Sequence, residues 1–248
     1  MYNRPYNENG LLIMECPSSD FSIKYWDKPK NQIDSENAIN GGFFASFVET
    51  INGKKVNFTM PVANICCDHG GNIPEISIKY IKEWTKNAGY NDFKVTMTSR
   101  QNPYKQFKDK QVSTIMIHNN NDVEFDEVSS LPLKCKYALS GIPVVRNSEY
   151  VDWIKFAVPQ GWGDNLSFID AGYRNFIGHK GTKIYIIADK TVSSNFAYHL
   201  DTYRKIQELD LEDVIAIDGG GSFIFRGNGN TLLRTNENKR INNICVIQ

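Results

Sequence analysis

The sequence has no long apolar run, no excess of charge of either sign and no even set of cysteines. A membrane-spanning helix needs about 18 or more consecutive apolar residues, and no segment approaches that length. Residues 11–14 (LLIM) are the apolar stretch nearest the N-terminus, and they are too short for the apolar region of a signal peptide. We therefore expect a protein that has no membrane span and is cytoplasmic as synthesised.

The formal charges balance, with 28 Lys and Arg against 28 Asp and Glu in 248 residues. A protein that coats nucleic acid relies on an excess of positive charge. The balance therefore argues against nucleic acid as a partner. Hydrophobic residues make up 41% of the chain and charged residues 23%, which is ordinary for a globular protein and excludes a disordered or fibrous one.

The five cysteines cannot all pair within the chain. An odd number without a secretion signal favours reduced thiols. Cys66, Cys67, Asp68 and His69 are consecutive, but adjacent cysteines do not readily bind one ion together, and no second cluster follows. We expect buried thiols beside a loop histidine, and the sequence assigns no metal ligand.

Apolar spacing predicts short strands and two helices. The helices are expected at 75–88, between Pro74 and Gly89, and at about 196–209. Strands are predicted at 93–98, 112–117, 154–158, 183–188 and 214–217, a hairpin with a Gly/Asn turn at 223–233, and exposed loops at 104–110 and 118–127. The fold class that follows is α+β, with mixed, largely antiparallel β-sheets and a few packed helices. Residues 1–36 are expected to form an N-terminal extension or edge strands, and 37–248 the main domain.

In three segments, two apolar residues precede a polar residue that is followed by glycine: 38–44 (AINGGFF), 138–143 (ALSGIP) and 216–222 (AIDGGGS). Glycine lets a ligand approach the backbone, and successive N–H groups can bind an anion. The alternative for each segment is a tight turn. In 216–222, three glycines follow a carboxylate at the end of a buried strand, so this segment is the strongest candidate site. Ile224 stands where a nucleophile elbow or a dinucleotide-binding motif requires glycine.

These segments, together with 173–178 (YRNFIG) and 240–243 (RINN), occur in the order expected of the phosphodiester glycosidase family. From about residue 37 to its C-terminus the chain resembles that family. The resemblance implies a phosphodiester-glycosidase-like fold and a hydrolase that releases a sugar of the GlcNAc or glucose type from a sugar-1-phosphodiester. The substrate would be a nucleotide sugar or a glycosylated, phosphate-containing cell-wall polymer such as a teichoic acid. The family's arginine segment usually reads Pro-Arg-Thr-Ala-Ile-Gly, so Arg174 and Gly178 match while their neighbours differ.

The resemblance and the chemistry of such a substrate together assign roles to individual residues. Arg174 is the expected phosphate clamp, because its planar fork matches phosphate oxygens. Asp218 is the leading catalytic carboxylate, as base, nucleophile or electrostatic stabiliser, unless it only caps a turn. Asp170 and Glu149 remain alternatives for the second carboxylate, whose distance from Asp218 would separate retention from inversion. His179 could act as an acid near neutral pH, unless it is simply solvated.

The expected substrate-binding residues are Asn40, Gly41, Gly42, Ser140, Gly141, Gly219, Gly220, Gly221, Ser222, Arg240 and Asn243. Trp153, Trp162 and Tyr173 could stack on a sugar ring, although aromatic residues between short strands usually belong to the core.

Several alternatives remain open at this stage. No cofactor is required, but a divalent ion such as calcium is not ruled out, and the oligomeric state is not assigned. Because many relatives are secreted or lysosomal and this chain shows no signal, a phage or prophage product, carried on a virion or released by lysis, is one expectation. Instead of a glycosidase, the chain could be a non-catalytic binding module for teichoic acid-like polymers, or a metal-dependent phosphodiesterase that cleaves the P–O bond.

Overall fold

The computed structural model describes residues 4–51, 54–61, 63–67, 107, 110–162, 173–189, 196–236 and 238–248. The predicted helix 75–88, the predicted strand 93–98 and most of the predicted loop 104–110 lie outside these residues, as do Asp68, His69 and Asp170. The strands are β1 (Tyr6–Glu8), β2 (Leu11–Pro17), β3 (Phe21–Pro29), β4 (Asn37–Asn40), β5 (Phe44–Ile51), β6 (Lys54–Pro61), β7 (Ile65–Cys66), β8 (Val112–His118), β9 (Val123–Val128), β10 (Cys135–Ser140), β11 (Ile142–Arg146), β12 (Glu149–Tyr150), β13 (Arg174–Lys180), β14 (Lys183–Asp189), β15 (Asp213–Ile217), β16 (Ile224–Gly227), β17 (Asn230–Arg234) and β18 (Arg240–Ile247). The helices are α2 (Trp153–Gln160) and α3 (Phe196–Gln207), and short 3-10 turns occupy Ser18–Asp20, Lys30–Gln32 and Gly220–Ser222.

The described strands form a seven-stranded sheet in the order β1-β2-β14-β13-β15-β11-β12, a five-stranded sheet in the order β17-β16-β4-β18-β3, a four-stranded sheet in the order β7-β10-β8-β9, and the hairpin β5-β6. Every pairing between them is antiparallel. The prediction of an α+β fold is therefore wrong: the described structure is β-rich, with two helices, because the sheets cover one another and leave little core for helices to cover.

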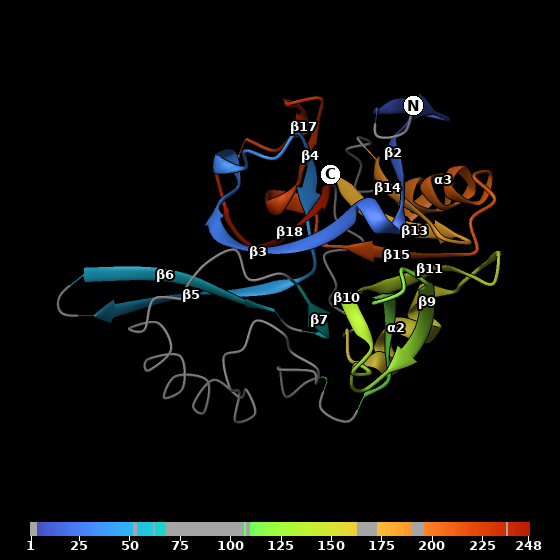
Figure 1. Ribbon diagram of the computed structural model, residues 1–248, viewed down its shortest axis with the longest axis horizontal. Coiled ribbons are helices and arrows are strands. Elements are labelled where there is room, and N and C mark those ends of the chain that lie inside the picture. Colours follow the sequence, from blue (N-terminus) through green and yellow to red (C-terminus); the bar gives the residue numbers. More distant parts are fainter. Residues whose placement is uncertain are drawn as a thin grey trace.

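One apolar core lies between the sheets (Figure 1). It contains Ile177, Ile186 and Ile215 from the seven-stranded sheet, Ile39, Phe225 and Cys245 from the five-stranded sheet, and Ile115 and Leu139 from the four-stranded sheet. The other face of the seven-stranded sheet, represented by Phe176 and Ala216, packs with Tyr203 and Ile206 of α3. Because successive side chains point to opposite faces of a strand, β13 and β15 contribute to the core on both faces, through Phe176 and Ile177 of β13 and through residues 214–217 of β15.

The N-terminal residues contribute strands to two sheets. β2 lies between β1 and β14 in the seven-stranded sheet, and β3 pairs with β18 at one edge of the five-stranded sheet. The hairpin β5-β6 extends away from the other strands (Figure 1).

Several predicted elements are confirmed: α3, β8, β14, β15 and the hairpin β16-β17 all fall where the sequence patterns place them. The predicted strand at 154–158 is wrong, because these residues lie in α2. A short apolar run fits a buried helix as well as a strand. Here Asp152 Oδ1 accepts a hydrogen bond of 3.4 Å from the Lys155 N–H, as a helix N-cap does.

The predicted loop at 118–127 is also wrong. Only a turn separates β8 from β9, and His118 is buried. Acidic residues alternate with apolar ones along β9, which is the period of a half-exposed strand and not of a loop.

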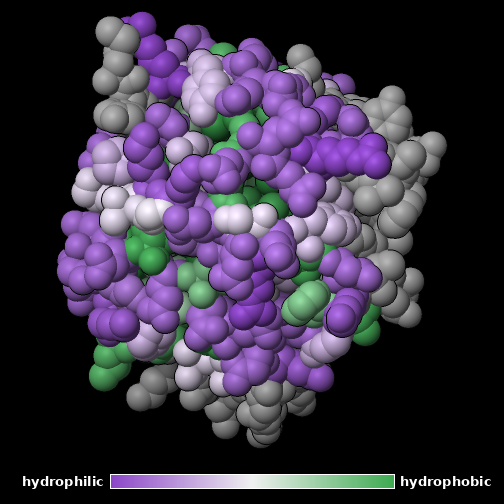
Figure 2. All heavy atoms as spheres, turned by 90° about the vertical axis from the view of Figure 1, so that its right-hand side faces the viewer, coloured by the Kyte–Doolittle hydropathy of each residue, from purple (hydrophilic) through white to green (hydrophobic). Residues whose placement is uncertain are grey.

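The face of the molecule shown in Figure 2 is mainly hydrophilic, and its apolar side chains lie in small separate areas. No helix among the described residues is long and apolar enough to cross a bilayer. All five cysteines are buried, and none forms a disulfide.

Candidate functional site

Asp218 and Arg174 meet at one end of the seven-stranded sheet. Antiparallel pairing of β13 with β15 places Asn175 opposite Ile217. Arg174 precedes Asn175 and Asp218 follows Ile217, so continuing the same register sets the two charged residues opposite each other. Arg174 is only 8% exposed. The register of β13 against β15 thus places the expected phosphate clamp opposite the leading candidate for the catalytic carboxylate.

The Asp218 carboxyl group titrates near neutral pH. Burial raises its pKa from an ordinary 3.8 to about 6, although the Ser222 hydroxyl, the charge of Lys239, the Gly219 N–H and the charge of Arg174 all act in the opposite direction. Its Oδ2 is buried and has no hydrogen-bond partner among the described residues. A carboxyl group with this pKa can take up and release protons near pH 7, as a general base or acid must.

The glycines after Asp218 allow a close approach to the start of β13. The Gly220 N–H donates a 3.0 Å hydrogen bond to the Tyr173 carbonyl, which also accepts a 3.3 Å bond from Arg174 Nη1. A Cβ on Gly219 would lie 2.7 Å from the same carbonyl oxygen, and Gly220 has a φ of +54°. Residues with side chains fit neither position well, so the loop depends on glycine to lie against Arg174.

Asn40 fixes this loop from the five-stranded sheet. Its Nδ2 donates a 2.6 Å hydrogen bond to the Asp218 carbonyl. Its Oδ1 accepts bonds of 2.6 Å from Asn175 Nδ2 and 3.0 Å from the Ile224 N–H. Asn40 was expected to bind a sugar hydroxyl. In the structure its amide is hydrogen-bonded within the protein, and these bonds position the Asp218 loop.

Replacing Asn40 by Ala is expected to destabilise the protein by about 2–4 kcal/mol, because it removes partners from three buried or part-buried polar groups. Chemical denaturation of wild-type and variant protein measures this change. Asn230→Ala is the matched control: Asn230 is exposed, and among the described residues its side chain bonds only the Asn228 carbonyl of the same turn, so about 0.5 kcal/mol or less is expected. Equal destabilisation by the two variants would contradict the role given to Asn40.

The segment at Gly41 and Gly42 packs against Asn243. The Gly42 N–H donates a 2.9 Å bond to Asn243 Oδ1, and a Cβ on Gly41 would lie 1.9 Å from that oxygen. The segment at Ser140 and Gly141 lies beside β15, since a Cβ on Gly141 would lie 2.4 Å from the Ala216 carbonyl. All three glycine segments predicted from the sequence are therefore near neighbours.

A cavity of about 10 Å³ lies between the first two segments, lined by Gly42, Asn64, Ser140, Asn243 and neighbouring residues. This is room for about one water molecule. The Ser140 hydroxyl bonds the Thr114 hydroxyl at 2.8 Å. These contacts make 41–42, 140–141 and Asn243 a close-packed support beside the Asp218 loop.

His179 and Glu149 lie at the opposite end of the sheet from Asp218. His179 is five residues along β13 from Arg174, which is about 16 Å at a strand rise of 3.3 Å per residue. Glu149 pairs with Arg146 on β11, near the same end. Of the five catalytic candidates, the structure brings together Asp218 and Arg174 and separates these two, while Asp170 is outside the described residues.

The environment of His179 is a separate polar cluster. Its Nε2 lies 2.9 Å from Asp213 Oδ2, and its Nδ1 lies 3.3 Å from the Gly181 carbonyl. Burial lowers the pKa of His179, but Asp213, Gly181 and Glu212 together raise it above its ordinary value. The ring lines an open cavity of about 400 Å³ with His118. A structural histidine that is hydrogen-bonded to Asp213 accounts for these contacts.

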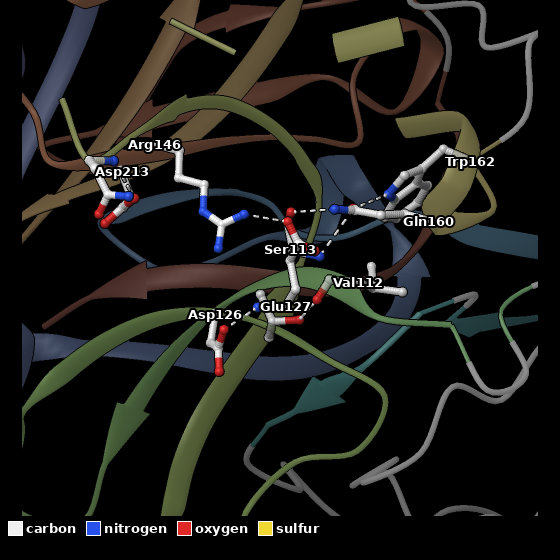
Figure 3. A network of polar contacts seen from close by, with 10 residues as sticks. Val112, Ser113, Asp126, Glu127, Arg146, Gln160, Trp162 and Asp213 are labelled. Atoms are coloured by element: carbon white, nitrogen blue, oxygen red, sulfur yellow. Dashed lines mark hydrogen bonds and ion pairs between the residues drawn. The ribbon is translucent and has the colours of Figure 1, made fainter. Parts of the chain in front are cut away.

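Trp162 is a core residue. Its ring packs 5.0 Å from that of Phe43 and 4.8 Å from that of Phe107. Figure 3 shows its Nε1 donating a hydrogen bond of 3.4 Å to Gln160 Oε1. The Tyr173 ring stacks on Phe223 at 4.8 Å, directly after the glycine loop. No side-chain position of Trp153 is described.

Sequence reasoning missed Lys30, Asn175 and Lys239. Lys30 is 2% exposed, and its Nζ donates 3.1 Å to the Phe223 carbonyl, which ends the glycine loop. Lys239, whose charge lowers the pKa of Asp218, precedes Arg240, the second arginine considered for the phosphate. No sequence pattern marks Lys30, but Asn175 and Lys239 each adjoin a predicted arginine.

No family model and no curated protein matches the chain. Among solved structures, it is similar over 92% of its length to 88% of the catalytic domain of zebrafish N-acetylglucosamine-1-phosphodiester α-N-acetylglucosaminidase, auto-inhibited by its pro-peptide, with 15% identity and a TM-score of 0.46. It is also similar over 99% of its length to 61% of a hypothetical protein from Synechocystis, with 11% identity and a TM-score of 0.49. Likeness at these values is distant and assigns neither a family nor an activity.

Proposed function

We propose that the protein is a hydrolase that releases a sugar from a sugar-1-phosphodiester. The observation that carries the proposal is the placement of the Asp218 carboxyl, with a pKa of about 6, opposite Arg174 and beside the Gly219–Gly220 backbone. The order of the glycine and arginine segments, which resembles that of phosphodiester glycosidases, supports the same conclusion.

The reaction divides naturally between the two charged residues. Water adds to the anomeric carbon while the bond from that carbon to the phosphate oxygen breaks, and the bonding electrons stay on the phosphate oxygen. Asp218, as general base, takes the proton of the attacking water and later returns it to solvent. The departing phosphomonoester carries more negative charge than the substrate did, so Arg174 binds it more strongly as the bond breaks.

The finer assignment is a sugar of the GlcNAc or glucose type on a nucleotide or on a teichoic acid-like polymer. It follows from the sequence resemblance alone. The location of each charged group supports phosphodiester chemistry without selecting among these substrates.

Incubation in ¹⁸O water tests the proposal. Purified protein is mixed with UDP-GlcNAc, UDP-glucose or a glycosylated teichoic acid, and the products are followed by mass spectrometry. Free sugar carrying ¹⁸O is expected, because attack occurs at the anomeric carbon. Label on a phosphate product would mean that the P–O bond breaks, as in a phosphodiesterase. Polymer binding without any product would favour the non-catalytic binding module.

A further inference from the structure

Lys30 is a buried lysine that contacts the end of the loop that follows Asp218. It is 2% exposed and begins the 3-10 turn directly after β3. Its Nζ donates hydrogen bonds of 3.1 Å to the Phe223 carbonyl and 2.5 Å to the Thr235 hydroxyl. Its backbone N–H donates a 3.0 Å bond to the Lys239 carbonyl. A residue near the start of the chain thus binds three positions near its end.

Stability alone is a poor explanation for an ammonium group in this position. Removing a charged group from water is costly, and replacing a buried charge by an apolar residue of similar volume is often neutral or stabilising. The Phe223 carbonyl also accepts a 3.3 Å bond from the Thr235 N–H, so it would keep a partner if the Lys30 ammonium group were removed. The ammonium group adds direction, because its N–H donors determine where the carbonyl and the hydroxyl lie.

The position of Phe223 affects both charged residues of the candidate site. Its N–H donates a 3.1 Å bond to the Gly220 carbonyl and so closes the turn that begins after Asp218. Phe223 is fully buried, and its ring stacks at 4.8 Å on that of Tyr173, the residue before Arg174. A hydrogen bond that fixes Phe223 therefore also fixes the loop of Asp218 and the start of β13.

The groups around Asp218 make its titration sensitive to this geometry. Burial raises the pKa of Asp218, whereas the Ser222 hydroxyl, the charge of Lys239, the Gly219 N–H and the charge of Arg174 lower it. Two of these residues, Ser222 and Lys239, either precede or are themselves the residues that the buried lysine bonds. Loss of that lysine would therefore weaken the groups that favour the charged carboxylate.

We propose that Lys30 is a positioning residue of the candidate site, whose ammonium group holds the loop after Asp218 in the geometry that Asp218 requires as a base. The assignment rests on the proposed hydrolase and adds to its site a residue of the N-terminal segment. Lys30 does not contact the substrate in this assignment. It acts through the Phe223 carbonyl.

Lys30→Met tests the assignment, because methionine keeps most of the aliphatic side chain and removes the ammonium group. The pKa of Asp218 is measured by ¹³C NMR titration of its carboxyl carbon, and Asp218→Asn identifies the signal. This pKa should rise by about 0.5 or more, since the groups that lower it are no longer held in place. Turnover should fall about 10-fold or more, and the acid limb of its pH profile should move to higher pH.

Lys28→Met is the matched control, because Lys28 is exposed and its Nζ lies over the Trp26 ring. It should change neither the pKa of Asp218 nor turnover. Thr235→Val removes only the hydroxyl partner of the ammonium group, so it should raise the pKa less. An unchanged Asp218 pKa in folded Lys30→Met, or in Thr235→Val if Lys30→Met does not fold, would overturn the assignment.

The two proposals fail in different ways. If the Asp218 pKa rises in Lys30→Met but the wild type hydrolyses no sugar-phosphodiester, the hydrolase proposal is wrong and Lys30 still positions the loop. If hydrolysis is observed and Lys30→Met keeps the wild-type kcat, acid limb and Asp218 pKa, the hydrolase stands and the role of Lys30 is wrong.

Discussion

Replacing Asp218 by Asn is expected to lower turnover by at least about 100-fold, the loss typical of a missing general base, and at the same time to stabilise the folded protein at neutral pH. The amide keeps an oxygen that can accept the bonds from Ser222 and Gly219, so the loop retains its contacts. It cannot take a proton from water. Loss of activity together with a gain in stability would identify a carboxyl group that is kept charged at a cost to the fold.

The sign of the stability change follows from the pKa. Burial raises the pKa of Asp218 from 3.8 to about 6, so the folded state binds this proton more tightly than the unfolded state. The wild type therefore loses stability as pH rises from about 4 to about 6, and the loss is complete above that range. Its size is on the order of 2–3 kcal/mol, since each pKa unit corresponds to about 1.4 kcal/mol. Asn at this position removes the effect.

Denaturation of both proteins at pH 5 and pH 8, beside initial rates, measures the two effects. Asp213→Asn is the control on the same strand. Asp213 bonds His179 at the far end of β15, so this variant should be less stable and should keep its turnover. Wild-type turnover in Asp218→Asn, or lower stability than wild type at pH 8, would contradict the role given to Asp218.

The sequence patterns predict those elements whose structure depends on residues close together in the chain. β14 and β15 are recognisable as short apolar runs, the β16-β17 hairpin by its Gly/Asn turn, and α3 by its helical spacing. The same reasoning predicts a strand at 154–158, where the structure has α2. Five mostly apolar residues are too few to distinguish the period of a helix from that of a strand. It takes β9 for a loop, because the acidic residues on its half-exposed side hide the alternation.

The candidate site divides in the same way. Asp218 is predictable from the glycines that follow it, and Arg174 from the resemblance to phosphodiester glycosidases. Their placement opposite each other depends on the register of β13 against β15, which joins residues far apart in the chain. The amide of Asn40 is of a kind that binds sugar hydroxyls. Only the packing of the two sheets shows that this amide is hydrogen-bonded within the protein. His179 could have been separated from Arg174 in advance, had residues 174–180 been recognised as one strand.

Replacing Arg174 by Ala is expected to lower kcat/KM by at least about 100-fold and to move the pH dependence of the remaining activity. The loss in rate follows from removing the cation that binds the departing phosphate. The pH effect follows from the effect of the Arg174 charge on Asp218. The charge of Arg174 lowers the pKa of Asp218, so without it that pKa rises further. If Asp218 acts as a base, activity depends on its charged form. The acid limb, which the Asp218 pKa of about 6 predicts near pH 6 for the wild type, should then move to higher pH.

Arg174→Lys separates charge from geometry. Lysine keeps the positive charge but not the planar fork that holds two phosphate oxygens at once. The acid limb should then stay near that of the wild type, while kcat/KM falls to a value between those of the wild type and Arg174→Ala. Circular dichroism and melting curves confirm that each variant is folded, which matters because Arg174 is buried. An unchanged kcat/KM in Arg174→Ala would remove the phosphate clamp from the mechanism. A fall in rate with no movement of the acid limb would show that Asp218 titrates independently of Arg174, and that the two residues do not act as one site.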